Sequence, residues 1–170
     1  DAFERALETW RCATRINWKT SSTTTTTNTF GADGENVVAY ASLGTPTYGT
    51  FFSAFHWDST NCSGTDWYLT EADIIFNSAF ASFFHTDTTM PTTNDQDFES
   101  EALHTLGYAH LLSNVRDPND PMYSTLTFAD TLRSLTQNNI DGGIYIRNKS
   151  VNNTICSQPL MNIFPPCISC

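Results

Sequence analysis

The twenty residues HTLGYAHLLSNVRDPNDPMY, numbered 104 to 123, decide how this chain folds and what chemistry it can perform. A helical pattern over residues 97–112 runs into this stretch. Its apolar side carries Phe98, Ala102, Leu103, Leu106 and Ala109. Two prolines within four residues, Pro118 and Pro121, then require a turn. The stretch therefore predicts a helix that is followed by a turn at the two prolines. Met122 comes directly after this turn.

A zinc-dependent hydrolase built on a helix needs two imidazoles four residues apart and a carboxylate beside the first. The metal lowers the pKa of its bound water toward about 7, and the carboxylate takes the proton. The metzincin pattern adds a glycine turn, a third histidine and a turn that contains methionine. Residues 104–123 resemble this segment in the matrixins, in their secreted bacterial form, with the spacing kept through Met122.

The resemblance extends over residues 1–147. AFERALETWRCATRINW (2–18) resembles the first family helix and its following strand, TEADIIFN (70–77) the edge strand along which substrates lie, and TQNNIDGGIYI (136–146) the last helix. It implies a metzincin-like α+β fold, with a twisted mixed sheet, a long N-terminal helix, an active-site helix and a C-terminal helix. The matrixin-like domain would cover 1–147, and a Cys/Pro-rich tail 148–170.

The functional positions of the family are mostly occupied by other residue types. The first zinc histidine is His104, but the second falls on Tyr108 and the third on Asn114. A phenol with an ordinary pKa near 10 and an amide are poor zinc ligands. The general base falls on Thr105, which cannot accept a proton at neutral pH, and the turn glycine falls on Leu111. The resemblance thus implies a domain without catalysis and without a bound cofactor.

Histidines elsewhere provide the alternative, an active zinc endopeptidase with unusual ligands. His110 follows His104 by six residues, so it should face about 240° away on the helix. His56 and His85 fall in segments that we interpret as loops, where solvated histidines are the expected outcome. Zinc remains the implied cofactor only under this alternative.

Composition excludes two classes of partner. The chain has 170 residues, enough for one domain with a sizeable core. Its 8 Lys+Arg against 18 Asp+Glu give a net charge of -10, which argues against nucleic acid because phosphate backbones are bound by clustered cations. No run of about 18 apolar residues occurs, so we expect no membrane span.

Five cysteines indicate an oxidising, extracellular or cell-surface environment, and we expect a secreted chain. The disulfide candidates are Cys12, Cys62, Cys156, Cys167 and Cys170. Their pairing is open, because leaving one out and pairing four allows 15 arrangements. Zinc binding by the last two is less favoured, since no second such pair completes four ligands. The glycosylation candidates are Asn61, Asn148 and Asn152.

The remaining segments predict a small number of further elements. Asp1 and Glu4 suit a capping box at the start of the first helix. A short buried strand is expected at 37–41, a long surface excursion at 45–66 and another strand near 74–76. The last helix is expected to end at the glycine pair 142–143.

The family strand that precedes the first helix has no counterpart in this chain. A sheet does not tolerate unpaired central backbone groups, so we expect another chain or a retained cleaved segment to supply a strand. The tail at 148–170 folding back, or a variant of the fold with four strands, are the alternatives. The preferred function is a secreted, catalytically inactive pseudopeptidase that serves as a binding or structural module. A third possibility is surface adhesion or carbohydrate binding, because aromatic rings can stack on sugars, although core packing accounts better for most of them. The aromatic candidates are Trp10, Trp18, Trp57, Trp67, Tyr48 and Tyr68.

Overall fold

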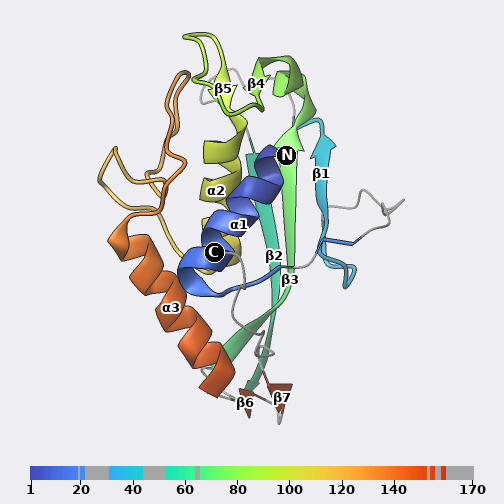
Figure 1. Cartoon of the computed structure of the whole chain (residues 1–170). Helices are drawn as coiled ribbons and strands as arrows, with labels where there is room; N and C mark the ends of the chain where they lie inside the picture. The colour runs from blue at the N-terminus through green and yellow to red at the C-terminus, as the bar shows by residue number, and fades with distance from the viewer. Residues whose placement is uncertain are drawn as a thin grey trace. The chain divides into compact units, whose positions relative to one another are not determined.

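The computed structural model describes residues 1–18, 20–21, 31–43, 53–63, 66–152, 154–155 and 158–159 (Figure 1). Side chains at 54–63, 66–68, 154–155 and 158–159 lie outside the description. The chain divides into two compact units, one of Asp1–Lys19 with Phe84–Cys170 and the other of Thr20–Phe83. Helices and strands are both present, so the predicted α+β class is confirmed.

Three helices build the first unit. They are α1 (Ala2–Thr14), α2 (Phe98–Ala109) and α3 (Gln137–Asn152), and α1 packs against both of the others (Figure 1). The predicted capping box is confirmed: the Asp1 carboxylate accepts from the Glu4 N–H, and Glu4 reaches back to the Asp1 backbone nitrogen. The predicted positions of the first two helices are confirmed, although residues 15–18 carry no strand.

The centre of this unit is Trp10, which is fully buried on α1. Its Nε1 donates a 3.0 Å hydrogen bond to the carbonyl of Leu103 on α2, so burial leaves no unsatisfied indole N–H. On α3, a Cβ added at Gly143 would lie 2.6 Å from Cγ2 of Thr14. Glycine at this position therefore permits a close approach of α3 to α1.

The prediction that Gly142 and Gly143 end the last helix is wrong. Helix α3 continues through both to Asn152, because a buried glycine here serves helix packing rather than termination. The expected boundary between residues 147 and 148 therefore falls inside α3. Beyond it, β6 (Thr154–Ile155) and β7 (Gln158–Pro159) pair antiparallel.

Two short strands, β4 (Phe84–His85) and β5 (Gln96–Asp97), pair in parallel before α2. Arginine side chains fix the chain between them. Arg5 contacts the carbonyls of Thr86 and Asp87 and pairs with Glu99, while Arg133 contacts the carbonyls of residues 87–89.

The second unit contains a mixed three-stranded sheet. Its strands are β1 (Val38–Ala41), β2 (Ser53–Ser63) and β3 (Asp66–Asn77), followed by the 3₁₀ helix η1 (Ser78–Phe83). The order is β1-β3-β2, with β1 parallel and β2 antiparallel to β3. The mixed sheet agrees with the prediction.

Three details of the sheet differ from the prediction. Residues 70–77 were expected at an edge, but β3 is central, and Ile74, Ile75 and Phe76 are all buried, as expected for a strand covered on both faces. The strand at 37–41 was expected to be buried, yet Val38 and Tyr40 are 49% and 48% exposed. The excursion at 45–66 contains β2, whose Ser/Thr/Asn-rich sequence and irregular register hide strand alternation.

The loop before β1 is fastened to two buried carboxylates on β3. Asp73 accepts from the backbone N–H groups of Gly31 and Val37, at 3.1 and 3.0 Å. Glu71 accepts from the N–H groups of Asp33 and Gly34. These bonds satisfy the buried carboxylate oxygens with backbone donors. None of the described helices has the length and apolar character needed to cross a bilayer.

Candidate functional site

Helix α2 carries His104 and Tyr108, two of the three positions that the sequence resemblance predicts as zinc ligands, and the third, Asn114, follows the helix. It begins at Asp97, whose carboxylate accepts a 2.9 Å hydrogen bond from the N–H of Ser100 as an N-cap. Almost every residue of α2 is buried, including His104, which is 8% exposed. The side chains on this helix are therefore held in fixed positions by the surrounding core.

The side chains at the three zinc-ligand positions form a hydrogen-bonded chain. Nε2 of His104 lies 3.1 Å from the hydroxyl of Tyr108, and that hydroxyl lies 2.5 Å from Oδ1 of Asn114. On its other side, Nδ1 of His104 lies 2.7 Å from the carbonyl oxygen of Pro121. The structure thus brings these three predicted positions together, but around a phenol hydroxyl.

The protonation of this chain follows from its donors. The Pro121 carbonyl can only accept, so Nδ1 of His104 carries a proton. Burial lowers the pKa of His104, so at neutral pH the ring is uncharged and its Nε2 accepts from the Tyr108 hydroxyl. That hydroxyl also lies within donating distance of Oδ1 of Asn114, and its single proton can serve only one of these two acceptors at a time.

Tyr108 is poorly suited to bind a metal as a phenolate. Burial raises the pKa of its hydroxyl, an effect that the hydrogen bond to Asn114 opposes. The neutral phenol instead bridges a ring nitrogen and an amide. This arrangement supplies hydrogen bonds and no anionic ligand.

Thr105, at the position where the sequence resemblance predicts a general base, carries a buried hydroxyl. Thr105 is 1% exposed, and its Oγ1 donates a 2.8 Å hydrogen bond to the carbonyl of Glu101, one turn earlier on the same helix. A threonine that bonds back to its own helix has no acid–base role at neutral pH.

The turn after α2 keeps a backbone that favours glycine. Leu111 has a φ of 61°, in the left-handed region. Its N–H donates to the Tyr108 carbonyl and the N–H of Leu112 donates to the Gly107 carbonyl, the two bonds of a Schellman motif. Leucine therefore occupies a position whose geometry is ordinarily that of glycine.

Met122 packs directly beneath α2. It is fully buried, and a Cβ added at Gly107 would lie 2.1 Å from its Sδ atom. The segment is held by a parallel bridge between Val115 and Tyr123 and by the buried carboxylate of Asp120. That carboxylate accepts from the Met122 N–H, the Thr136 hydroxyl and the Asn139 amide. The close approach of Met122 to the helix thus depends on glycine at 107.

The other histidines lie apart from this chain of side chains. His110 points away from His104, as expected, and accepts a 2.8 Å hydrogen bond from Nε1 of Trp18. The prediction of solvated loop histidines is wrong for His85, which lies in β4, is 16% exposed in its side chain and contacts Asp87 at 2.7 Å. His56 belongs to β2 rather than a loop, and its side chain lies outside the description.

The cysteine and glycosylation candidates are only partly described. Cys12 is disulfide-bonded. Its partner is among the other four cysteines, whose side chains all lie outside the described part, so the pairing stays open. Asn148 and Asn152 are exposed on α3. The side chain of Asn61 lies outside the description.

The residues at the zinc positions do not fit a zinc ion. His104 does donate through Nδ1 to a backbone carbonyl, as metal-binding histidines commonly do. However, its Nε2 is engaged by Tyr108, and the remaining positions offer a neutral phenol and an amide. Within the described ranges, no three His, Cys, Asp or Glu side chains gather closely enough to hold a metal.

Sequence reasoning located these positions but missed their hydrogen bonding. The spacing of His104 and Tyr108, four residues apart on a helix, was the signal that they could touch. No pattern in the sequence indicated the bond between Tyr108 and Asn114, which depends on the turn at Leu111. No protein-family model matches the chain, and no curated protein matches it either.

Proposed function

We propose that this chain is a catalytically inactive, matrixin-like metallopeptidase domain that serves as a binding or structural module in an extracellular assembly. The carrying observation is the Tyr108 hydroxyl, which lies 3.1 Å from the ring nitrogen of His104 that a zinc ion would need. Asn114 holds this hydroxyl from the other side. The three ligand positions therefore satisfy one another without a metal.

Two further features support descent from a metallopeptidase. The glycine-type backbone at Leu111 and the buried Met122 under α2 are features that an active-site turn of this family would require. Neither is needed for a bare helix to end, and the strained φ at Leu111 carries a cost. A former enzyme that lost its ligands and base while keeping its backbone accounts for both.

Reversion of the altered positions tests the inactive reading. A variant with Thr105→Glu, Tyr108→His, Leu111→Gly and Asn114→His restores the complete ligand set and base. We expect the unsubstituted protein, freed of metal and titrated with zinc, to show no stoichiometric binding at this site. The variant should bind one zinc, measured by calorimetry and by elemental analysis after dialysis.

A matched control tests whether zinc binding by the variant requires the two added histidines. The double variant Thr105→Glu/Leu111→Gly changes the same helix but adds no zinc ligand, so it should remain metal-free. Stoichiometric zinc in the unsubstituted protein, lost on His104→Ala, together with cleavage of a denatured protein substrate, would overturn the proposal in favour of a zinc endopeptidase with unusual ligands.

The binding role is proposed to involve strand addition. Among the described residues, β1 stands at one end of the strand order, and its residues Val38 and Tyr40 are about half exposed. Another chain, or a retained cleaved segment, pairing along β1 would cover these apolar side chains. The disulfide at Cys12 agrees with an oxidising, secreted location.

Native mass spectrometry of the protein isolated from its source tests this role. We expect a mass above that of the chain alone, from a bound peptide or second subunit, and slowed hydrogen exchange at residues 38–41 relative to the purified chain. A bare chain with unchanged exchange at β1 would contradict strand addition.

A further inference from the structure

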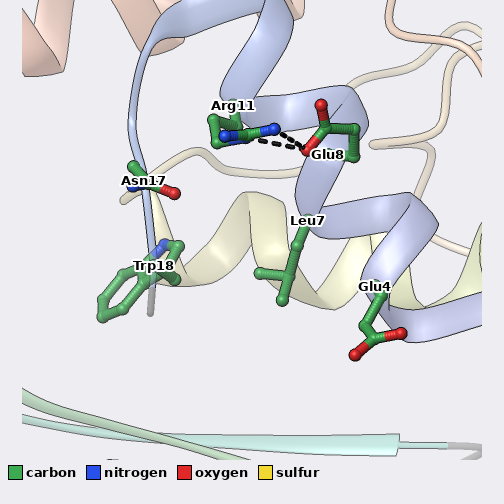
Figure 2. Close-up of a pocket in the computed structure, with 6 residues that line it drawn as sticks. All are labelled: Glu4, Leu7, Glu8, Arg11, Asn17 and Trp18. Atoms are coloured by element: carbon green, nitrogen blue, oxygen red, sulfur yellow. Dashed lines mark hydrogen bonds and ion pairs between the residues drawn. The ribbon is translucent and has the colours of Figure 1, made fainter. Parts of the chain in front are cut away.

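A hollow of about 190 Å³ lies on the first unit, between α1 and the segment that follows it (Figure 2). Its apolar and aromatic lining comes from Leu7 on α1 and Trp18 on the segment that follows it. The polar side chains that line it are Glu4, Glu8, Arg11 and Asn17. The volume is below the roughly 300–1,000 Å³ of pockets that bury drug-sized ligands, so it suits a single ring or side chain.

The indole of Trp18 is held in place by the imidazole of His110. Its Nε1 donates a 2.8 Å hydrogen bond to His110, and the two rings stack with an interplanar angle of 20° and centroids 6.2 Å apart. His110 is itself buried and contacts Trp10 edge to face, with ring centroids 4.6 Å apart. The wall of the hollow is therefore an immobilised aromatic ring, which lowers the entropic cost of binding a ligand.

The polar lining is mixed in charge and in hydrogen-bonding type. Arg11 forms an ion pair with Glu8, visible as dashed lines in Figure 2, and Asn17 can both donate and accept. An anion would meet the carboxylates of Glu4 and Glu8, and a cation would meet the guanidinium of Arg11. A neutral ligand with both donor and acceptor groups avoids both conflicts.

We propose that this hollow binds one pyranose ring of a neutral oligosaccharide. A pyranose has an apolar C–H face, which can lie on Trp18 and Leu7, and hydroxyl groups that both donate and accept. Those hydroxyls match the carboxylate, guanidinium and amide groups around the rim. This site is independent of the zinc-position residues on α2 and of the pseudopeptidase proposal.

NMR titration of the ¹⁵N-labelled full chain tests the site. The probes are cellotetraose, N-acetylated chitotetraose and mannotetraose, and the readout is the Trp18 indole N–H signal. At least one probe should shift this signal saturably, with a Kd of about 1 mM as a single bound ring allows. No shift from any of the three would overturn the proposal.

Variants distinguish this hollow from other surfaces. Trp18→Ala should weaken binding about tenfold or more, and Asn17→Ala, which leaves the aromatic wall intact, by about threefold to tenfold. Tyr145→Ala removes an aromatic that is 60% exposed on α3 and should leave affinity unchanged. The peptide acetyl-Lys-Ala-Lys-amide is a further probe. If it shifts the Trp18 indole signal saturably and no sugar does, the hollow is a basic-peptide site and the sugar assignment is refuted.

Discussion

The indole N–H of Trp18 donates a 2.8 Å hydrogen bond to Nε2 of His110, a residue that is buried and only 2% exposed. Because an indole nitrogen can only donate, Nε2 must remain unprotonated for this bond to exist. Burial lowers the pKa of His110 to about 3. Among the described residues, its Nδ1 has no hydrogen-bond partner, so nothing compensates a positive charge on this ring.

The first prediction concerns stability against pH. The pKa of His110 is lower in the folded protein than its ordinary value near 6.5, so the unfolded chain takes up a proton first as pH falls. The free energy of unfolding should therefore fall by about 2 kcal/mol between pH 7 and pH 5 on account of this residue. Urea denaturation at the two pH values measures the change.

The control is His110→Gln, which keeps an acceptor for Trp18 but does not titrate. Its stability should depend less on pH than that of the unsubstituted protein, by the same amount. Burial also lowers the pKa of His104, and this contribution is shared by both proteins. Equal pH dependence in the two proteins would contradict the prediction.

The second prediction concerns the turn after α2. Leu111→Gly should raise the free energy of unfolding by about 1 kcal/mol, because glycine accepts the φ of 61° without strain. Leu111 is 52% exposed, so little packing is lost. Thermal unfolding should shift upward by about 2–4 °C. Leu111→Ala is the matched control: it retains a Cβ and should show no gain.

The third prediction concerns the contact between α2 and Met122. Gly107→Ala places a Cβ 2.1 Å from Sδ and 2.8 Å from Cε of a methionine that is fully buried. We expect a loss of about 1–3 kcal/mol in the free energy of unfolding from this overpacking. In a double-mutant cycle with Met122→Ala, the combined loss should be smaller than the sum of the single losses. Simple additivity would show that the two sites do not touch.

Much of the helical part could be predicted from local signals. The capping box at Asp1 and the apolar spacing of α1 and α2 are read within a few residues, and both helices lie where expected. The end of α3 could not be read in this way. Gly143 looks like a terminator in sequence, but its role is to let Thr14 approach, a contact with a residue far away in the chain.

The sheet and the candidate site show the same limit. Ile74, Ile75 and Phe76 are consecutive apolar residues, and all three are buried. Such a run indicates a strand that is covered on both faces, which is typical of a central strand and not of an edge strand. The positions of His104 and Tyr108 followed from motif spacing. The bond from Tyr108 to Asn114 did not, because it depends on where the chain goes after Leu111.

The fourth prediction concerns the arginine before α3. Arg133 donates to both oxygens of the fully buried Asp97 carboxylate and to backbone carbonyls at 87–89, and the pKa of its guanidinium is raised chiefly by the hydrogen bond to Asp97. Arg133→Met should cost about 3 kcal/mol in the free energy of unfolding, since it leaves the carboxylate unpaired. Arg133→Lys should recover only part of this, because an ammonium cannot span the same acceptors.

Urea denaturation checks these values against Arg147→Lys, whose guanidinium contacts only an exposed neighbour, Asn148, among its hydrogen bonds in the described part. That control should leave stability unchanged. If Arg133→Met lowers the free energy of unfolding no more than Arg147→Lys does, the contacts of Arg133 with Asp97 and with the carbonyls of residues 87–89 do not contribute to stability.

The last prediction tests the order of donors from His104 to Asn114. In the unsubstituted protein the single proton of the Tyr108 hydroxyl can be donated either to Oδ1 of Asn114 or to Nε2 of His104. Replacing Asn114 with aspartate supplies a charged group that can only accept, so the hydroxyl donates to it and not to His104. Nε2 of His104 then gains a partner only when it is protonated, and the new negative charge favours that form. Asn114→Asp should raise the pKa of His104 above that in the unsubstituted protein.

Asn114→Ala is the matched control, because it removes the amide without imposing an acceptor and leaves Tyr108 free to donate to His104. Titration of the His104 ring by NMR should therefore show a higher pKa for the aspartate variant than for both the alanine variant and the unsubstituted protein. If the aspartate and alanine variants titrate alike, the hydroxyl of Tyr108 does not link the side chains of His104 and Asn114, and the three residues do not form one hydrogen-bonded chain.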